Sequence, residues 1–128
     1  MNSLQRLMNN ITGWSDSTFG SKDRNPSIVY HLKKEVDELI EAINVVANNK
    51  NNKAPITKIE YSTELAKMEY ADCFILLLDS AQHFKISAEE LINLANKKLE
   101  INKSRAWGKP DENGVCEHVI LEEEHEEL

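Results

Sequence analysis

The sequence predicts an all-α protein of four helices, packed in the manner of a four-helix bundle. Apolar residues recur at helical spacing over several long stretches, and no segment shows the alternation of a convincing strand. The chain has 128 residues, of which 41% are hydrophobic and 29% are charged. That length and that composition are typical of a single globular domain with a modest core.

The first two helices are bounded by recognisable signals. We expect a short first helix over residues 3–12, followed by a loop rich in Gly, Ser and Asp over residues 13–25. Asn25 and Pro26 then provide an N-cap and a proline at the first helical position, so the second helix is expected from 26 to about 48. Six of its apolar residues share one helical face: Leu32, Val36, Leu39, Ile40, Ile43 and Ala47.

The last two helices follow a polar loop. The segment 48–55 (NNKNNKAP) interrupts the apolar pattern, and the third helix is expected over about residues 59–84. A capping box that starts at Ser87 begins the fourth helix. This helix is expected to run to about Trp107, because Gly108 is a typical C-terminal stop signal.

Charge and termini narrow the class of protein. The net charge is −7, and five glutamates near the C-terminus supply most of it, which argues weakly against nucleic-acid binding by the whole surface. We find no apolar signal segment at the N-terminus, and the longest apolar run (FILLL) is too short to span a bilayer. Two cysteines do not make a disulfide framework. We therefore expect a cytoplasmic protein without a membrane or nucleic-acid partner.

The third expected helix carries acids in an apolar setting. On a helical wheel, six residues form one stripe: Leu65, Glu69, Asp72, Leu76, Asp79 and His83. The rest of the wheel is largely apolar, and a helix that is apolar nearly all round is expected to be buried. A buried carboxylate is costly unless it is paired or bound to a metal. The acids of this helix are therefore candidates for a binding site.

A second pair of acids lies upstream. Glu35 and Glu38 are three residues apart, on the same flank of the second helix as His31. They could face Glu69 and Asp72 across a helix pair, and four oxygen ligands without a thiolate suit Mg²⁺ or Mn²⁺. Two other readings remain open. The upstream pair could lie on a solvated face with neighbouring lysines, and the downstream pair could be salt-bridged to a lysine.

The fourth expected helix carries cations. Lys98, Asn102 and Arg105 share one face, and an arginine fork suits phosphate oxygens. Carboxylates that hold a divalent metal, with cations nearby, are the groups used to hydrolyse phosphate esters and phosphoanhydrides. No Walker loop is present. An alternative role for Lys98 and Arg105 is only to neutralise Asp79 or Glu69.

These motifs resemble a known family. Glu35-x-x-Glu38, followed about thirty residues later by Glu69-x-x-Asp72, resembles the all-α nucleoside triphosphate pyrophosphohydrolases of the MazG-like superfamily. Three further stretches resemble its phage and bacterial dATP/dGTP pyrophosphohydrolase branch: STFG at 17–20 with Arg24, ADCFILLLDSA at 71–81, and KKLEINKSRAWGKPDENGVCEH at 97–118. The resemblance covers about residues 3–118.

The resemblance implies hydrolysis of a nucleoside triphosphate, dGTP or dATP in this branch, to the monophosphate and pyrophosphate with Mg²⁺ or Mn²⁺. It implies four metal ligands: Glu35, Glu38, Glu69 and Asp72. Glu35 and Glu38 are also the implied catalytic residues, with Glu35 orienting or deprotonating the attacking water. The implied substrate-binding residues are Lys98, Asn102, Arg105, Asp79, His31, Trp14, Phe19 and Arg24. Among these, Trp14 and Phe19 match positions around the base, where packing in the core is an equally good reading.

The resemblance also implies an assembly. We expect a MazG-type domain over residues 1–118, an acidic tail over 119–128, and a homodimer or homotetramer with pockets at or near subunit contacts. Two alternatives remain open. One is the same chemistry on a pyrimidine or modified nucleotide such as dUTP or dCTP. The other is a non-catalytic helical interaction protein whose core acids are salt-bridged.

Overall fold

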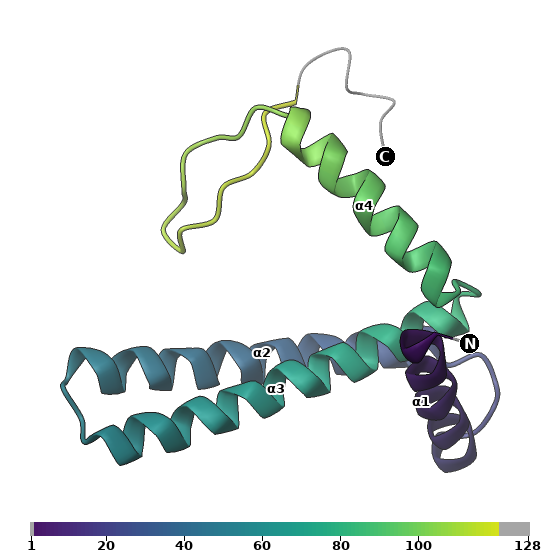
Figure 1. The fold of residues 1–128 in the computed structure, drawn as a ribbon, viewed down its shortest axis with the longest axis horizontal. Coiled ribbons are helices and arrows are strands. Elements are labelled where there is room, and N and C mark those ends of the chain that lie inside the picture. Colours follow the sequence, from purple (N-terminus) through teal and green to yellow (C-terminus); the bar gives the residue numbers. More distant parts are fainter. Residues whose placement is uncertain (1, 121–128) are drawn as a thin grey trace. The chain divides into compact units, whose positions relative to one another are not determined.

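The structure, a computed structural model, describes residues 2–120 and contains four helices. They are α1 (Ser3–Phe19), α2 (Asn25–Asn51), α3 (Ile56–His83) and α4 (Ala88–Ser104), drawn in Figure 1. Within residues 2–120 no strand forms, and the prediction of an all-α protein is confirmed. None of the helices in this range combines the length and the apolar composition needed to cross a membrane.

The chain divides into two compact units, Met1–Ala88 and Glu89–Leu128, and each is described by itself. The predicted packing of all four helices into one bundle therefore stays a prediction. The predicted domain over 1–118 with a tail over 119–128 also stays a prediction, and most of that tail lies outside the described residues.

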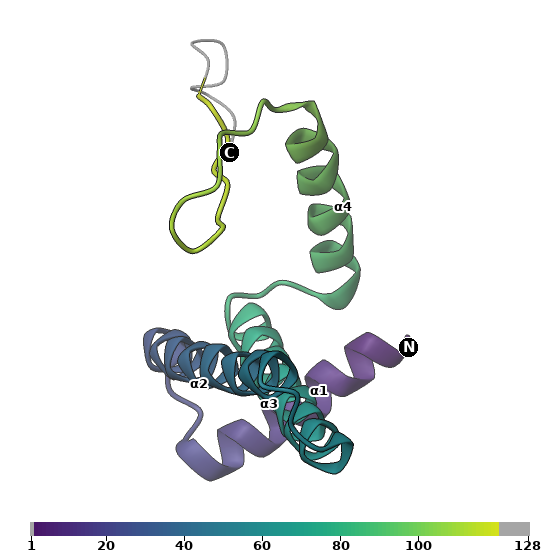
Figure 2. The ribbon, with the colours of Figure 1, turned by 90° about the vertical axis from the view of Figure 1, so that its left-hand side faces the viewer.

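The first unit is built on a helical hairpin. α2 and α3 run antiparallel and side by side, joined by a short loop over residues 52–55, and α1 packs against α3 (Figures 1 and 2). Burial of apolar side chains is the dominant stabilising term in such packing. The core lies mainly where α1 meets the hairpin, and its buried apolar residues are Met8, Ile11, Ile28, Ala66, Leu78, Ala81 and Ala88.

The first helix is longer than predicted. α1 runs to Phe19, so the predictions of a helix over 3–12 and a loop over 13–25 were wrong between residues 13 and 19. Gly, Ser and Asp disfavour helix interiors in isolation, but tertiary contacts override weak propensities. Here Ser15 is buried and Asp16 is partly buried, and both bond to side chains of α3. The helix ends at Gly20, whose φ of 100° is costly for other residues.

The ends of the hairpin also differ from the prediction. α2 continues through Asn51, three residues beyond the predicted end, and α3 begins three residues early at Ile56. The amide of Asn49 donates to Ser62 Oγ at 3.2 Å, so part of the predicted loop is held as helix against α3. At the other end Asn25 is already helical and does not act as the predicted N-cap.

The third helix is not buried on all sides within one chain, contrary to expectation. Several large apolar side chains on it are exposed, including Met68, Tyr70 and Leu77, with exposed fractions of 64%, 57% and 49%. With Leu32 and Val36 of α2, part of this surface forms an apolar groove of about 620 Å³. A surface of this kind is typical of a site that another molecule covers.

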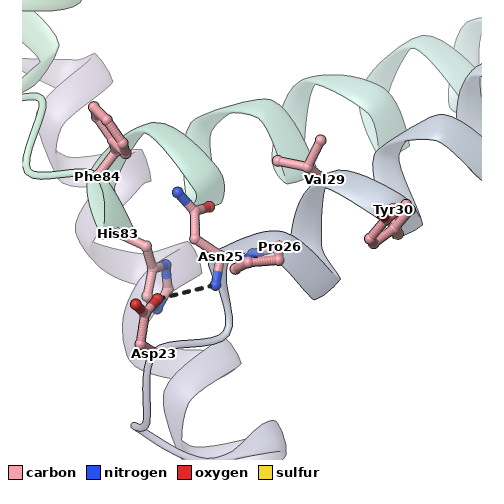
Figure 3. A pocket seen from close by; sticks show the side chains of 7 residues that line it. All are labelled: Asp23, Asn25, Pro26, Val29, Tyr30, His83 and Phe84. Carbon is pink, nitrogen blue, oxygen red and sulfur yellow. Dashed lines mark hydrogen bonds between the residues drawn. The ribbon is translucent and has the colours of Figure 1, made fainter.

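A second cavity, of about 530 Å³, lies where the start of α2 meets the end of α3 (Figure 3). The backbone N–H of Asn25 donates to the carboxylate of Asp23 at 3.3 Å, and the hydroxyl of Ser80 donates to the Asn25 side chain at 2.6 Å. These bonds fix the entry into α2. The cavity is lined by Asp23, Asn25, Pro26, Val29, Tyr30, His83 and Phe84.

The second unit consists of α4 and the segment that follows it. α4 begins just after Ser87, as predicted, but ends at Ser104 rather than at Trp107. The indole N–H of Trp107 donates to the carbonyl of Asn102 at 2.9 Å. Gly108 N–H donates to the carbonyl of Glu117 at 2.8 Å, so the two ends of the closing loop are tied together. A Cβ at position 108 would lie 3.3 Å from that same carbonyl, which favours glycine there.

Candidate metal centre and adjoining pocket

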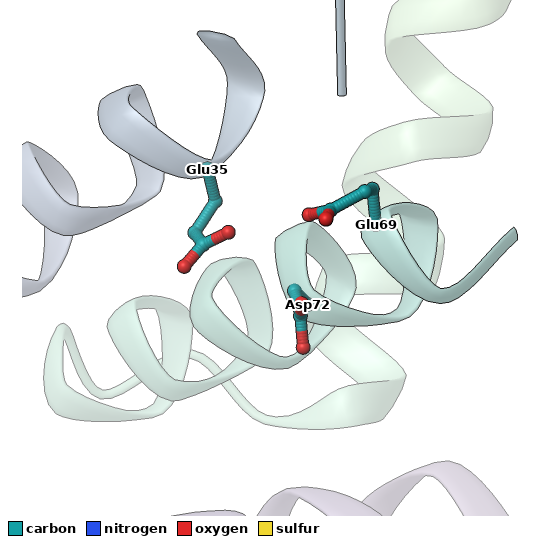
Figure 4. Close-up of side chains that lie close together, drawn as sticks. All are labelled: Glu35, Glu69 and Asp72. Carbon is teal, nitrogen blue, oxygen red and sulfur yellow. The ribbon is translucent and has the colours of Figure 1, made fainter. Parts of the chain in front are cut away.

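Three acidic side chains converge between α2 and α3. Carboxylate oxygens of Glu35, Glu69 and Asp72 all lie within 4.8 Å of one another, and Figure 4 shows Glu35 extending from one helix towards Glu69 on the other. The spacing of three residues puts Glu69 and Asp72 on one side of α3. Because α2 packs antiparallel along α3, Glu35 lies opposite them. The sequence-based pairing of these acids is therefore present in the structure.

Glu38 lies in the same electrostatic environment. The pKa of Glu35 is raised, first by a hydrogen bond shared with Glu38, then by burial and by the charges of the surrounding acids. Burial raises the pKa of Glu69, and the charges of Glu38 and Asp72 raise it further. The pKa of the Cys73 thiol is raised by burial and then by these same four carboxylates. The charges of Glu38 and Asp72 therefore act on both Glu35 and Glu69, and a hydrogen bond with Glu35 partly offsets the rise in the pKa of Glu69.

The donor set fits a divalent cation. Glu35 Oε2 and Glu69 Oε2 are buried and have no hydrogen-bond partner among the described residues. A buried acceptor without a partner loses hydration and gains no bond in return, and this loss is greater when the acceptor is charged. A hard cation such as Mg²⁺ or Mn²⁺ would relieve both the missing bonds and the mutual repulsion. The cluster therefore meets the chemical requirements of a metal site.

His31 links the acids to a neighbouring pocket. Its Nε2 lies 3.3 Å from Glu35 Oε1, one helical turn away on α2, and its ring also lines the pocket. The side chain of Glu35 is 18% exposed and that of His31 is 54% exposed. The acidic cluster and the pocket therefore adjoin each other along α2.

This pocket has a volume of about 260 Å³ and an aromatic wall. The rings of Trp14 and Phe19 meet edge to face with centroids 5.5 Å apart, and the Arg24 guanidinium lies 5.7 Å from the Phe19 centroid. Five predicted substrate-binding residues line it: Trp14, Phe19, Arg24, His31 and Asp79. The remaining lining residues are Ile11, Ser15, Ser27, Ile28, Ile75 and Leu76. Sequence reasoning missed these six.

A network of charged and polar groups supports the pocket. Asp79 is only 3% exposed, and its Oδ2 accepts a hydrogen bond from the Ser15 hydroxyl at 2.7 Å. Arg24 Nη2 donates to Ser15 Oγ and to Asp16 Oδ1, both at 2.8 Å. The His83 ring lies between two acids, with Nε2 2.8 Å from Asp16 and Nδ1 3.1 Å from Asp79 Oδ1. These contacts connect α1, the start of α2 and α3.

The electrostatics of this network favour the charged forms of Asp16 and His83. The pKa of Asp16 is lowered, chiefly by its hydrogen bond to His83 and also by Arg24, although burial opposes this. Burial alone would lower the pKa of His83, but hydrogen bonds to Asp79 and Asp16 and their charges raise it overall. The i, i+4 spacing of Asp79 and His83 was visible in the sequence, whereas Ser15 and Asp16 lay in a presumed loop.

Three predicted substrate-binding residues belong to the second unit. Lys98 and Asn102 lie on α4, and Arg105 directly follows it. The side chain of Arg105 donates to Asn102 Oδ1 at 3.5 Å, a long hydrogen bond between residues three apart. The predicted arrangement of this face towards the acids stays a prediction.

Comparison with known proteins supplies independent findings. A model of the family described as dATP/dGTP pyrophosphohydrolase matches residues 56–125, a stretch that includes α3 and α4. A protein of Salmonella phage PMBT28, described as a dATP/dGTP diphosphohydrolase, is 32% identical over 110 residues. The match covers 86% of this chain and 29% of the phage protein, so the chain spans less than a third of that relative. No solved structure matches the chain.

Proposed function

The chain belongs to the dATP/dGTP pyrophosphohydrolase family, and we propose that it hydrolyses dGTP or dATP to the monophosphate and pyrophosphate. The observation that carries the proposal is the cluster of Glu35, Glu69 and Asp72 beside the aromatic pocket. The cluster suits a triphosphate with its metal, and the pocket suits a nucleoside. The name of the phage relative supports the same substrate class.

We propose that Glu35, Glu38, Glu69 and Asp72 hold Mg²⁺ or Mn²⁺. The chemistry that such a cation supplies is neutralisation of phosphate charge and Lewis-acid activation of the phosphoryl group. In the reaction one water is consumed, the bond between the α- and β-phosphates breaks, and pyrophosphate leaves. Glu35 is the residue expected to orient that water and accept its proton, and its contact with His31 at 3.3 Å would steady the carboxylate.

The other predicted residues would bind the substrate around this centre. We expect Lys98, Asn102 and Arg105 to contact the phosphates, because cations stabilise the charge that develops on the departing pyrophosphate. Trp14 and Phe19 would contact the base, since aromatic side chains pack well on planar rings. The pocket of about 260 Å³ that they line supports this assignment.

We also propose that the chain functions as a homo-oligomer. The groove between α2 and α3 is apolar and is lined by Leu32, Val36, Tyr70, Ala71, Cys73, Phe74 and Leu77. A first unit with few fully buried apolar residues gains stability if a second copy covers this surface. The acids at the edge of the same helix pair would then lie close to the subunit contact.

The test is pyrophosphate release from the common ribo- and deoxyribonucleoside triphosphates, measured with Mg²⁺ and with EDTA. We expect release that requires the metal and favours dGTP or dATP. A preference for a pyrimidine nucleotide would keep the metal centre and reject this substrate assignment. Absence of release from every nucleotide, with Mn²⁺ as well as Mg²⁺, would contradict the proposed function.

A further inference from the structure

The bottom of the aromatic pocket is polar, and its main polar group is a carboxylate that accepts hydrogen bonds. Asp79 lines the pocket and is 3% exposed, so its carboxylate lies at the bottom rather than at the rim. An ionised carboxylate only accepts hydrogen bonds and offers about four acceptor sites. Ser15 takes one site on Oδ2 at 2.7 Å, and His83 Nδ1 lies 3.1 Å from Oδ1. Thr12 donates to Oδ1 from 3.4 Å, which is long for a hydroxyl donor.

The neighbours of Asp79 hold its carboxylate in one orientation. The Ser15 hydroxyl gives its proton to Asp79 and accepts a bond from Arg24 Nη2 at 2.8 Å. The hydroxyl proton is therefore committed to Asp79 and is not available to a base in the pocket. His83 Nδ1 lies 2.8 Å from the backbone carbonyl of Asp79 and 3.1 Å from Oδ1, so the short bond from Ser15 is the one that orients the carboxylate. The oxygens of the Asp79 carboxylate are therefore held in place as hydrogen-bond acceptors for a group bound in the pocket.

The two candidate bases differ in what they offer to such a floor. Guanine carries two adjacent donors, N1–H and the N2 amino group, which can pair with both oxygens of one carboxylate. Adenine carries the N6 amino donor beside N1, which is an acceptor and would face the second oxygen unpaired. A site built to pair with a substrate donor rejects the analogue that lacks it, because the buried group then loses its partner.

We propose that Asp79 is a specificity-determining residue that makes the pocket prefer guanine to adenine, so that dGTP is the better substrate. This inference rests on the proposed function, because it assigns the pocket to the base of the same nucleotide. A bidentate contact of this kind discriminates by roughly 10- to 100-fold between bases. Asp79→Asn would offer one acceptor and one donor, which matches adenine, and should reduce or reverse the preference.

The experiment is calorimetric titration of the full chain with dGMP and with dAMP in EDTA, so that binding does not depend on the metal centre. We expect dGMP to bind at least about tenfold more tightly, and Asp79→Asn to bring the two affinities together or to reverse their order. The ratio is the readout, because a loss of folded protein lowers both values equally. Ser80→Ala is the matched control, since it removes a neighbouring α3 bond, to Asn25, outside the pocket.

Each result decides the inference. A guanine preference that Asp79→Asn leaves unchanged, equal binding of both nucleotides by the wild type, or binding of neither would overturn it. If Asp79→Asn does not fold, Ser15→Ala decides, because loss of the orienting hydroxyl should lower the ratio severalfold and an unchanged ratio would reject the proposal. Pyrophosphate release by the wild type, assayed separately, tells whether the proposed function itself has failed.

Discussion

Glu35 and Glu69 hold carboxylates in surroundings that disfavour their charge. The pKa of Glu35 is raised by a hydrogen bond with Glu38 and then by burial and like charges, and the pKa of Glu69 is raised by burial and then by like charges. One oxygen of each lacks a hydrogen-bond partner among the described residues. A fold retains such a cluster at a cost to its own stability, which is characteristic of functional sites. Function and stability are therefore expected to respond in opposite directions when one of these acids is neutralised.

Glu69→Gln separates the two effects. We expect pyrophosphate release to fall by more than about 100-fold, because a metal ligand is lost. The pKa of Glu69 is raised first by burial and then by the charges of Glu38 and Asp72. The metal-free variant should therefore unfold at a higher urea concentration than the wild type, because it carries no charge to desolvate or repel. Steady-state assays and urea titrations in EDTA measure the two quantities.

Glu64→Gln is the control for that variant. Glu64 lies on the same helix, but it is exposed and bonds to Lys67 at 2.9 Å. It should keep normal turnover and nearly normal stability, because exposed ion pairs contribute little. If Glu69→Gln instead unfolded in dilute urea while Glu64→Gln did not, the acid would be a structural salt-bridge partner and not a metal ligand.

The Asp16–His83 pair predicts a pH dependence of stability. The pKa of His83 is raised, so its contribution is fully present below its ordinary value of 6.5 and is lost as the pH rises through its folded value. The pKa of Asp16 is lowered, so its contribution is present above 3.8 and is lost as the pH falls through its folded value. The pair therefore stabilises most between about pH 4 and 6.5.

His83→Gln tests this window. The difference in unfolding free energy between the wild type and the variant should be largest near pH 5–6 and should shrink as the pH rises above 6.5, because the contribution of the raised pKa of His83 is lost there. Urea denaturation followed by circular dichroism across that range measures it. A difference that stays constant from pH 5 to 8 would mean that His83 does not stabilise the fold through its charge.

At the level of elements, periodicity and spacing predicted the parts of the fold that depend on local pattern. The four helices and the pairing of two acidic motifs on facing helices follow from repeats of three and four residues. The helical state of the second half of α1 was not predicted from the sequence, because Gly13, Ser15 and Asp16 favour loops. Ser15 and Asp16 are held in the helix by contacts with Asp79 and His83, more than sixty residues away in the chain, and Gly13 lies in the same turn.

A few buried apolar side chains hold α1 against the hairpin. Met8 is completely buried, whereas its neighbour Leu7 is 38% exposed. Met8→Ala should lower the free energy of unfolding by about 2–5 kcal/mol through lost burial and a residual cavity. Leu7→Ala should cost clearly less, and urea titrations of both variants make the comparison. Equal losses would contradict the described docking of α1.

For the whole molecule, the sequence predicted the family more completely than it predicted the placement of the helices. The resemblance at residues 3–118 named the family that the comparison then matched at 56–125. Lys98, Asn102 and Arg105 belong to the second unit. The predicted proximity of their shared face to the acidic cluster therefore stays a prediction. A helical pattern indicates which residues share a face but not which surface that face meets, because that depends on side chains from distant segments.

The exposed apolar groove predicts the state of assembly. Light scattering coupled to size-exclusion chromatography should give a mass of at least twice 14.6 kDa. Leu77→Asp, at a position that lines the groove and is 49% exposed, should shift the protein towards the monomer, because a charge cannot be buried there without a partner. A wild-type monomer at micromolar concentration would contradict the proposed oligomer.

We propose that the carboxylates between α2 and α3 form a metal centre, and Mn²⁺ binding followed by electron paramagnetic resonance tests this without depending on turnover. Titration of the full chain should show at least one bound ion per chain, retained in Glu64→Gln and lost or strongly weakened in Glu69→Gln. Equal Mn²⁺ binding by the two variants, or none by the wild type, would contradict the account.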